Sequence, residues 1–287
     1  MPLITLTTDY GLKDYFAAAL KGKLFKVYAE ARIIDLTHHI QPFNIVETAY
    51  VLEAAHRDFP SGTIHLIGVN SESTEKHPLL ILRWNEQFFV SADNGIPSIL
   101  SQKSNPQALY KITYQAPNSR TDMDTLAYVA AHLAKGGDPL TVAEYYTQVK
   151  NVNALRSNTN SAGTEITGNI IHFDDMGNAI SSISKADFDA LVGDRSYEVM
   201  LNPSTTHKAI KYTSNLRRIH TSYKALNYTI EHASQEVMSQ EGSIFALFNE
   251  AGYLEIGIFR GIPNVNGTAR ELLGINYQDP IKIVFNS

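Results

Sequence analysis

Residues 7–15 read TTDYGLKDY, and they join a short β-prone run to the start of a predicted helix. The stretch places two carboxylates, Asp9 and Asp14, five residues apart at a strand-to-helix turn. In an α/β sheet such a turn lies beyond the carboxyl end of a strand, where ligands usually bind, and Gly11 permits a tight bend. Asp9 and Asp14 are therefore candidate ligand-binding residues. The alternative is that Asp9 only begins a turn and that Asp14 favours the dipole in the first helical turn.

The residues around this stretch alternate between strand and helix patterns. The pattern predicts strands at 3–8, 31–35 and 63–69, and helices at 15–28 and 45–57, the second helix capped by Asn44. Residues 63–69 are nearly all apolar, which is typical of a parallel strand that is buried on both faces. This alternation indicates βαβ units and an α/β domain with a mainly parallel sheet.

Two further β-prone runs, 79–84 and 87–91, precede Ala92-Asp93-Asn94-Gly95, which is a turn signal in its own right. A helix predicted over 124–135 ends at Gly136-Gly137, where a left-handed cap is expected. We expect this helix to close the first domain.

The composition changes at about residue 150, where Asn, Ser, Thr and Gly replace apolar residues. We therefore expect an α/β domain at 1–152, a linker at 153–164 and a second domain at 165–287. The second domain is predicted to be a smaller all-β domain, barrel-like or a sandwich, with one helix at 269–273. Its predicted strands are 168–173, 180–183, 197–201, 226–230, 243–249, 253–259 and 281–285.

The composition excludes several classes of protein. The formal net charge is −5 and no long Lys/Arg run is present, so neither nucleic acid nor a membrane surface is an expected partner, and a small molecule is. The absence of cysteine excludes disulfides, thiolate metal sites and cysteine nucleophiles. No basic segment followed by an apolar stretch begins the chain, and no apolar run approaches the ~20 residues of a membrane span. We expect a soluble, cytoplasmic protein.

Six motifs, taken in order, resemble one family. They are TTDYG at 7–11, Asp35 with LTHHI and PFN after it, FPSGTIHLIGV at 59–69, ADNG at 92–95, MGNAISSI at 176–183 and GYLEI at 252–256. Together they resemble the S-adenosylmethionine (SAM) hydroxide adenosyltransferases, or adenosine-forming SAM hydrolases, whose relatives are the fluorinases and chlorinases. The resemblance runs from about Ile4 to Phe285. It implies an N-terminal α/β domain, a C-terminal β-barrel, and a homotrimer whose active sites form between domains of neighbouring subunits.

The reaction that the resemblance implies converts SAM to adenosine and methionine. A nucleophile displaces methionine from the ribose C5′, and the sulfonium leaves without being protonated. The protein must hold the ribose, exclude bulk water and aim one nucleophile. SAM or a related nucleoside is then the expected ligand, with SAM as substrate and no metal or separate cofactor.

In the first domain, Asp9 matches the family's ribose-binding Asp, and Asp14 matches an acidic residue near the amino-acid end of SAM. Phe43 matches an aromatic residue that packs on the nucleoside; alternatively, it is an ordinary core residue after Pro42.

In the second domain, the segment 174–178 resembles the family's DxFGN motif, with Met176 in place of Phe. Asp174 then matches the residue that binds the methionine amine, and Asn178 an amide donor to the ligand. The alternative is a plain turn between two strands. The positions where backbone groups of the family meet the adenine edge are Ile258, Phe259 and Arg260.

The chain departs from the family where water is activated. Hydrolytic members have an Asp, an Arg and a His there, and the flanking motifs align these with Asn70, His77 and Thr121. Asn cannot act as a base, His is a cation only when protonated, and Thr offers a hydroxyl group. Ser73 alone matches the hydroxyl pattern of the halogenases. A shift of one residue in this loop would make Lys76 the cation.

These residues predict a divergent SAM hydrolase in which Asn70, His77 and Thr121 occupy the catalytic positions. Two alternatives stay open: adenosyl transfer to a nucleophile other than water, and a SAM or nucleoside sensor that kept the pocket without the chemistry.

Overall fold

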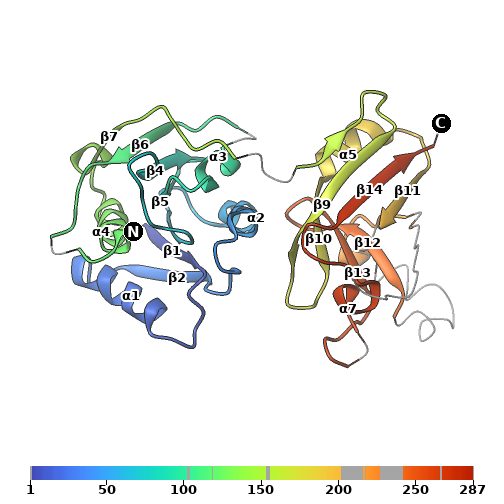
Figure 1. The fold of residues 1–287 in the computed structure, drawn as a ribbon, viewed down its shortest axis with the longest axis horizontal. Helices are drawn as coiled ribbons and strands as arrows, with labels where there is room; N and C mark the ends of the chain where they lie inside the picture. Colours follow the sequence, from blue (N-terminus) through green and yellow to red (C-terminus); the bar gives the residue numbers. More distant parts are fainter. Residues whose placement is uncertain are drawn as a thin grey trace. The chain divides into compact units, whose positions relative to one another are not determined.

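The computed structural model describes residues 2–101, 104–117, 119–152, 156–201, 216, 218–226, 242–265 and 267–286. The chain forms two compact units, Met1–Ala154 and Leu155–Ser287, each with its own sheet and core (Figure 1). None of the helices in the described part of the chain has both the length and the apolar character that a membrane span needs.

Unit 1 is an α/β unit with a seven-stranded sheet in the order β2-β1-β3-β5-β4-β6-β7. β1, β2, β3 and β5 pair in parallel, whereas β4 and β7 run against the other five strands. The sheet is therefore mixed, with most strands in one direction. Its strands are β1 (Leu3–Thr8), β2 (Arg32–Thr37), β3 (Ile64–Gly68), β4 (Leu79–Trp84), β5 (Gln87–Ala92), β6 (Ala108–Ile112) and β7 (Ala143–Tyr145).

Helices cover both faces of this sheet. Leu66 and Ile67, adjacent on β3, belong to different core clusters because successive strand residues point to opposite faces. The cluster of Leu66 contains residues of α1 (Phe16–Val27) and α4 (Asp122–Ala134), and the cluster of Ile67 contains residues of α2 (Ile45–Ala55) and α3 (Ile96–Leu100). Two 3₁₀ turns, η1 (His56–Asp58) and η2 (Pro139–Thr141), complete the unit.

The predicted elements of unit 1 are confirmed, with ends that differ by a few residues. The Asn44 side chain caps α2 by accepting the Glu47 N–H, and Gly136 ends α4 with φ +83°. All five residues of β3 are buried, as expected for a strand covered on both sides. β6 and β7 were not predicted from the sequence.

Unit 2 is built on an antiparallel sheet in the order β11-β14-β9-β10-β13-β12, with β8 paired to β9. Residues of α5 and α7 share its apolar core with the strands. The elements are β8 (Asn158–Thr159), β9 (Glu165–Phe173), β10 (Ala179–Ser184), α5 (Lys185–Val192), β11 (Tyr197–Leu201), β12 (Ile244–Phe248), β13 (Tyr253–Ile258), α7 (Ala269–Leu273) and β14 (Pro280–Phe285).

One short segment bonds to both edge strands of this sheet. Leu216 exchanges two backbone hydrogen bonds with Val199 of β11, at 2.8 and 3.1 Å. Four residues later, the His220 N–H donates to the Ala246 carbonyl of β12 at 2.8 Å. The segment therefore covers backbone groups that two edge strands would otherwise expose.

Three features of unit 2 differ from the predictions. The second domain was expected to contain one helix, but α5 is also present; Ser184 begins it by accepting the Asp187 N–H, a capping pattern readable in the sequence. Leu226 was predicted to begin a strand but lies in a helical turn over 223–226, and the rest of that predicted strand lies outside the described residues. β8 lies inside the stretch expected to be a linker.

A buried polar network lies within unit 1. His65 Nε2 and His56 Nδ1 lie 3.3 and 3.2 Å from Gln87 Oε1, and Gln87 Nε2 donates to the carbonyls of His56 and Phe59. The Thr5 hydroxyl lies 2.7 Å from His65 Nδ1. Burial lowers the pKa of His65 from 6.5 to about 4, so the folded protein keeps this imidazole neutral near pH 7.

We predict that the free energy of unfolding falls by about 2 kcal/mol between pH 7 and pH 5 because of His65. Below its unfolded pKa of 6.5, the unfolded chain protonates this imidazole, whereas the folded chain does so only near pH 4. Urea unfolding at both pH values measures the change. His65→Gln should lose most of the slope and keep the smaller part due to His56, whose pKa burial also lowers. A wild-type midpoint equal at both pH values would contradict this assignment.

Candidate functional site

The loops after β1 and β2 are joined by two hydrogen bonds. The Gly11 N–H donates to the His38 carbonyl at 2.6 Å, and Gly11 has φ +66°, which suits glycine. The Thr8 hydroxyl lies 2.7 Å from Nδ1 of the buried His38. These contacts hold the chain on either side of Asp9 at the carboxyl end of β1.

Asp9 lies against Phe43. Its Oδ2 accepts the Phe43 N–H at 2.9 Å, and Phe43 has φ +63° with its side chain 72% exposed. Phe43 is therefore not the core residue that its position after Pro42 also allowed. Asp14 is exposed and precedes the first residue of α1, Phe16, so it does not lie in the first helical turn.

The Asp93-Asn94 turn holds the loop after β3. Asn94 Nδ2 donates to the carbonyls of Val69 and Asn70, at 2.9 and 3.2 Å. The buried Asp93 carboxylate accepts the Lys150 N–H and lies 3.4 Å from His77 Nδ1. The turn is therefore an anchor for distant segments, and two predicted catalytic residues, Asn70 and His77, make contacts with it.

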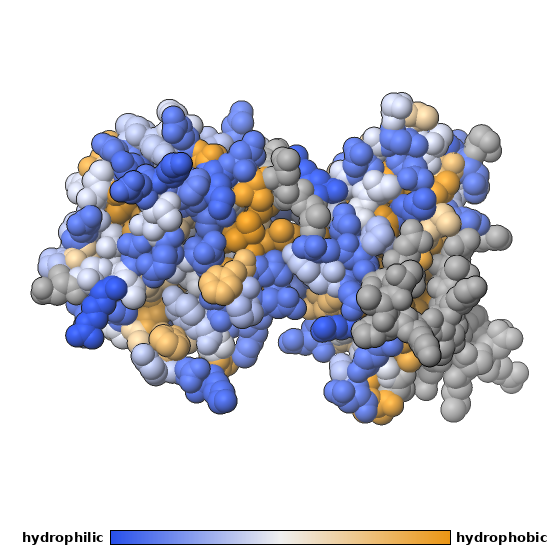
Figure 2. Space-filling view, in the orientation of Figure 1, coloured by the Kyte–Doolittle hydropathy of each residue, from blue (hydrophilic) through white to orange (hydrophobic). Residues whose placement is uncertain are grey.

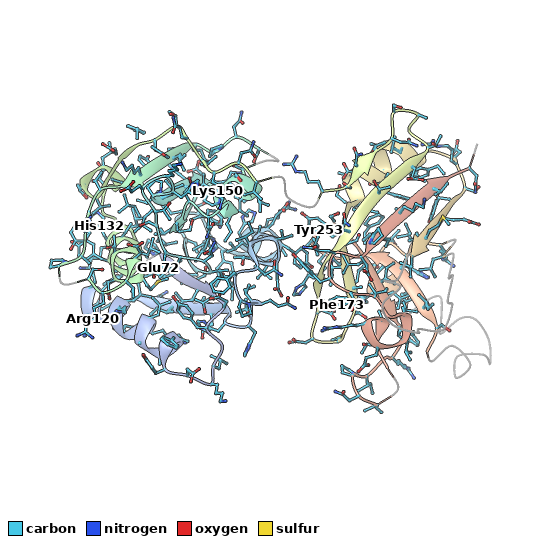
Figure 3. All side chains as sticks on the ribbon, in the orientation of Figure 1. Glu72, Arg120, His132, Lys150, Phe173 and Tyr253 are labelled. Carbon is cyan, nitrogen blue, oxygen red and sulfur yellow. The ribbon has the colours of Figure 1, made fainter. Side chains whose placement is uncertain are left out.

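A cleft of about 390 Å³ opens between α1 and the start of α4. Thr121, the third predicted catalytic residue, lines it together with Glu72 and Arg120, which are labelled in Figure 3. The Ser73 N–H donates to Asp122 Oδ2 at 2.5 Å and so fixes the β3 loop to the start of α4. The remaining lining residues are Tyr10, Tyr15, Phe16, Ala19, Leu20, Lys23, Met123 and Asp124.

In unit 2, Asp174 organises the turn between β9 and β10. Its Oδ1 accepts the N–H groups of Met176 and Asn178, at 3.0 and 2.8 Å, and its Oδ2 accepts Asn178 Nδ2 at 3.0 Å. Gly177, with φ +74°, permits the bend. The turn that was the alternative prediction is thus present, and Asp174 Oδ2 keeps capacity for one more donor.

Asn178 is fixed by a second carboxylate that sequence reasoning missed. Its Nδ2 also donates to Glu255 Oε1 at 3.1 Å, so both amide hydrogens are used inside the unit. Glu255 is buried, which raises its pKa, and the Tyr223 hydroxyl donates to the same oxygen. In this arrangement Asn178 offers a ligand its oxygen rather than the predicted amide hydrogen. Glu255 belongs to the GYLEI motif, but nothing in that motif indicated its contact with Asn178.

The segment after β13 is also held by backbone bonds. The Phe259 N–H donates to the Ser243 carbonyl at 2.8 Å, and its carbonyl accepts the Gly242 N–H at 3.0 Å. The Ile258 carbonyl accepts the Gly261 N–H at 2.9 Å, and Arg260 has φ +54°. The Phe259 backbone, predicted to meet the adenine edge, is therefore already paired within unit 2.

The structure brings the candidate residues together as two groups, one in each unit. On the face shown in Figure 2, hydrophilic residues predominate and hydrophobic residues emerge in a few patches. Four large apolar residues here are 47–72% exposed: Leu12, Tyr15 and Phe16, which are near Asp9 and Asp14 in the chain, and Phe43, whose N–H donates to Asp9. Apolar side chains beside carboxylates are typical of a surface that receives a partly apolar ligand or partner. Among the described residues, no group of three His, Cys, Asp or Glu could hold a metal ion.

The chain thus combines an α/β unit, with carboxylates beyond the ends of its parallel strands, and an antiparallel unit with a polar turn. The family model of the SAM hydroxide adenosyltransferase N-terminal domain matches residues 4–143, and that of the C-terminal domain matches residues 168–282. The chain belongs to the SAM hydroxide adenosyltransferase family.

Curated relatives match along nearly the whole chain. The (R)-S-adenosyl-L-methionine hydrolase of Methanocaldococcus jannaschii is 25% identical over 295 residues, covering 99% of this chain and 97% of the relative. The protein of the same name from Thermus thermophilus is 25% identical over 292 residues, covering 96% and 97%. A fluorinase from Nocardia brasiliensis is 33% identical over 63 residues, 22% of this chain and 21% of the fluorinase.

Solved structures support the fold. A conserved protein from Thermotoga maritima superimposes with a TM-score of 0.77 at 22% identity, covering 98% of this chain and 100% of that chain. At this identity the likeness shows that the fold is shared.

We predict that Gly177→Ala destabilises the Asp174 turn by more than positive φ alone explains. A Cβ at Gly177 would lie 2.5 Å from Thr268 Cβ, so the backbone must shift. Gly252→Ala is the matched control in the same unit, because Gly252 has φ +79°, close to the +74° of Gly177, and open space around the new Cβ. Thermal unfolding should show a loss of roughly 1 kcal/mol for the control and a clearly larger loss for Gly177→Ala. Equal losses would mean that the turn does not pack on Thr268.

Proposed function

We propose that this protein hydrolyses SAM to adenosine and methionine by attack of water on the ribose C5′. The observation that carries the proposal is the match to both domain models of the family, joined to relatives named as SAM hydrolases that align along almost their whole length. The reaction needs water as co-reactant and no separate cofactor, since the sulfonium leaves as a neutral thioether.

In this proposal, residues of both units hold the substrate. Asp9 binds the ribose hydroxyls, Asp14 lies at the amino-acid end, and Phe43 packs on the nucleoside. In unit 2, the free capacity of Asp174 Oδ2 suits the methionine amine, and Asn178 Oδ1 suits an adenine amine. The exposed apolar side chains near Asp9 support a site that a second unit completes.

The proposal extends to assembly and location. A homotrimer with sites between neighbouring subunits is expected by resemblance to the family, and a closed ring is a common way to build such sites. The segment that bonds to both β11 and β12 supports a barrel-like unit 2. A cytoplasmic location agrees with a substrate that is a soluble metabolite.

The products formed from SAM test this function. We predict that long incubation with SAM releases adenosine and methionine, and that in ¹⁸O-water the label enters the adenosine 5′-hydroxyl. Because the relatives are named for the (R) form, both sulfonium epimers should be supplied separately. A different 5′-substituted adenosine would identify another nucleophile, and binding of both epimers without any product would support a sensor.

Asp9→Asn tests the ribose site. The amide places a hydrogen-bond donor where a ribose hydroxyl needs an acceptor, and hydrogen bonds to charged groups contribute about 1.5–3 kcal/mol. Affinity for adenosine should therefore fall at least tenfold by calorimetry. Because Asn can still accept the Phe43 N–H through its oxygen, the loop itself should survive. Asp58→Asn makes the same substitution on the η1 turn and is the control for loss of a carboxylate outside the proposed ribose site. Equal binding by wild type and Asp9→Asn would reduce Asp9 to a turn residue.

A further inference from the structure

The cleft beside Tyr10 contains two carboxylates, Glu72 and Asp124. Asp124 is already occupied: it accepts the N–H groups of Arg120 and Thr121, at 3.0 and 3.4 Å, and pairs with Lys23. Burial raises the pKa of Asp124, but the Lys23 ion pair and the backbone donors outweigh burial, and its pKa lies below the usual value. A carboxylate stabilised in this way is a weak base.

Glu72 has far fewer partners. Its Oε2 lies 3.4 Å from the Asp122 N–H, a long contact that leaves most of its acceptor capacity unused. The same contact places its carboxylate one residue from Thr121, which lines the cleft with it. Among the lining residues, Glu72 is therefore the carboxylate that is open to a water molecule.

Glu72 also shares the cleft with Tyr10, the residue that follows Asp9 in the chain. Burial raises the pKa of the Tyr10 hydroxyl, and the negative charges of Asp9 and Glu72 raise it further. Both carboxylates therefore act on one phenol, and Tyr10 itself lines the cleft directly after Asp9 in the chain. The role inferred for Glu72 requires the C5′ of a ribose held by Asp9 to reach this cleft.

The residues aligned with the family's catalytic Asp and Arg have other contacts. The Asn70 carbonyl accepts Asn94 Nδ2, and His77 Nδ1 lies 3.4 Å from the buried Asp93 carboxylate. Neither Asn70 nor His77 lines the cleft, whereas Thr121 does. Of the residues of this loop, Glu72 is thus the one that lines the cleft, while the His77 imidazole lies beside the Asp93 carboxylate.

We propose that Glu72 is the general base of this enzyme, holding the attacking water together with the Thr121 hydroxyl; this inference rests on the proposed SAM hydrolysis. The water oxygen bonds to C5′, the bond from C5′ to sulfur breaks, and its electron pair remains on sulfur as the neutral thioether of methionine. One water proton passes to the Glu72 carboxylate, and the other remains in the 5′-hydroxyl of adenosine. The carboxylate also stabilises the positive charge that develops on the attacking oxygen.

The test compares Glu72→Gln with Glu75→Gln, an exposed glutamate of the same loop that does not line the cleft. General-base catalysis contributes about 10²–10⁴-fold, so Glu72→Gln should lower kcat at least 100-fold and leave adenosine binding unchanged by calorimetry. Glu75→Gln should keep wild-type kcat. In Glu72→Ala, added formate should restore part of the adenosine release by occupying the vacated cleft, an effect that a purely structural role would not produce.

The possible outcomes separate this inference from the function on which it rests. An active wild type with an equally active Glu72→Gln overturns the role of Glu72 and leaves SAM hydrolysis intact. Loss of activity together with loss of adenosine binding and no formate rescue also overturns it, because Glu72 would then only support the loop. A wild type that releases no adenosine from either epimer overturns the proposed function, and with it the step that Glu72 would serve.

Discussion

The buried Asp93-Asn94 turn is the constraint on which the loop that carries Asn70 and His77 depends. Asn94 uses its amide to bind the carbonyls of Val69 and Asn70, while the Asp93 carboxylate accepts the Lys150 N–H from the end of the unit. Gly95 follows with φ +106°, and a Cβ there would lie 2.3 Å from Val152 Cγ2. One turn thus fixes both the loop after β3 and the chain that leaves unit 1. Loss of the Asp93 or Asn94 side chain would leave the groups it binds without hydrogen-bond partners, which lowers the free energy of unfolding.

This anchoring explains why the loop after β3 can change its sequence without losing its place. Its beginning is fixed by Asn94, its end by Asp93, and its middle by the bond from Ser73 to Asp122 at the start of α4. Backbone groups supply most of these contacts, so side chains between the fixed points are free to differ. A polar side chain such as Glu72 can then face the cleft without weakening the fold.

Much of the fold follows from local patterns in the sequence. The run at Ile64–Gly68 is apolar and buried, Asn44 caps α2, and Gly136 ends α4, because each depends on a short-range rule of burial or capping. β7 was missed because three residues give too little periodicity, and α5 was missed because the surrounding strands dominated the interpretation.

The candidate site was less predictable than the fold, for a physical reason. The residues Asp9, Phe43, Asp174 and Asn178 could be named from motifs. The structure places Asp9, Asp174 and Asn178 in loops at strand ends and Phe43 in the turn before α2. The contact of Glu255 with Asn178 joins positions 77 residues apart, and the approach of Glu72 to Asp122 joins positions 50 residues apart. No local pattern reports contacts across such separations, since only the folded sheet brings these side chains together.

The chemistry of the proposed substrate, SAM, allows the base to lie at a different position of the loop after β3 than in the family's hydrolytic members. A sulfonium needs no acid to leave, so the protein has only to hold the ribose, exclude bulk water and accept one proton. In the proposed function, the first two tasks fall to positions such as Asp9, which resembles the family pattern. The third can be performed by any carboxylate that reaches the attacking water, whichever position of the loop carries it. Replacing the aligned Asp by Asn70 therefore removes a base from one position, while Glu72, two residues further on, supplies a carboxylate to the cleft that Thr121 lines.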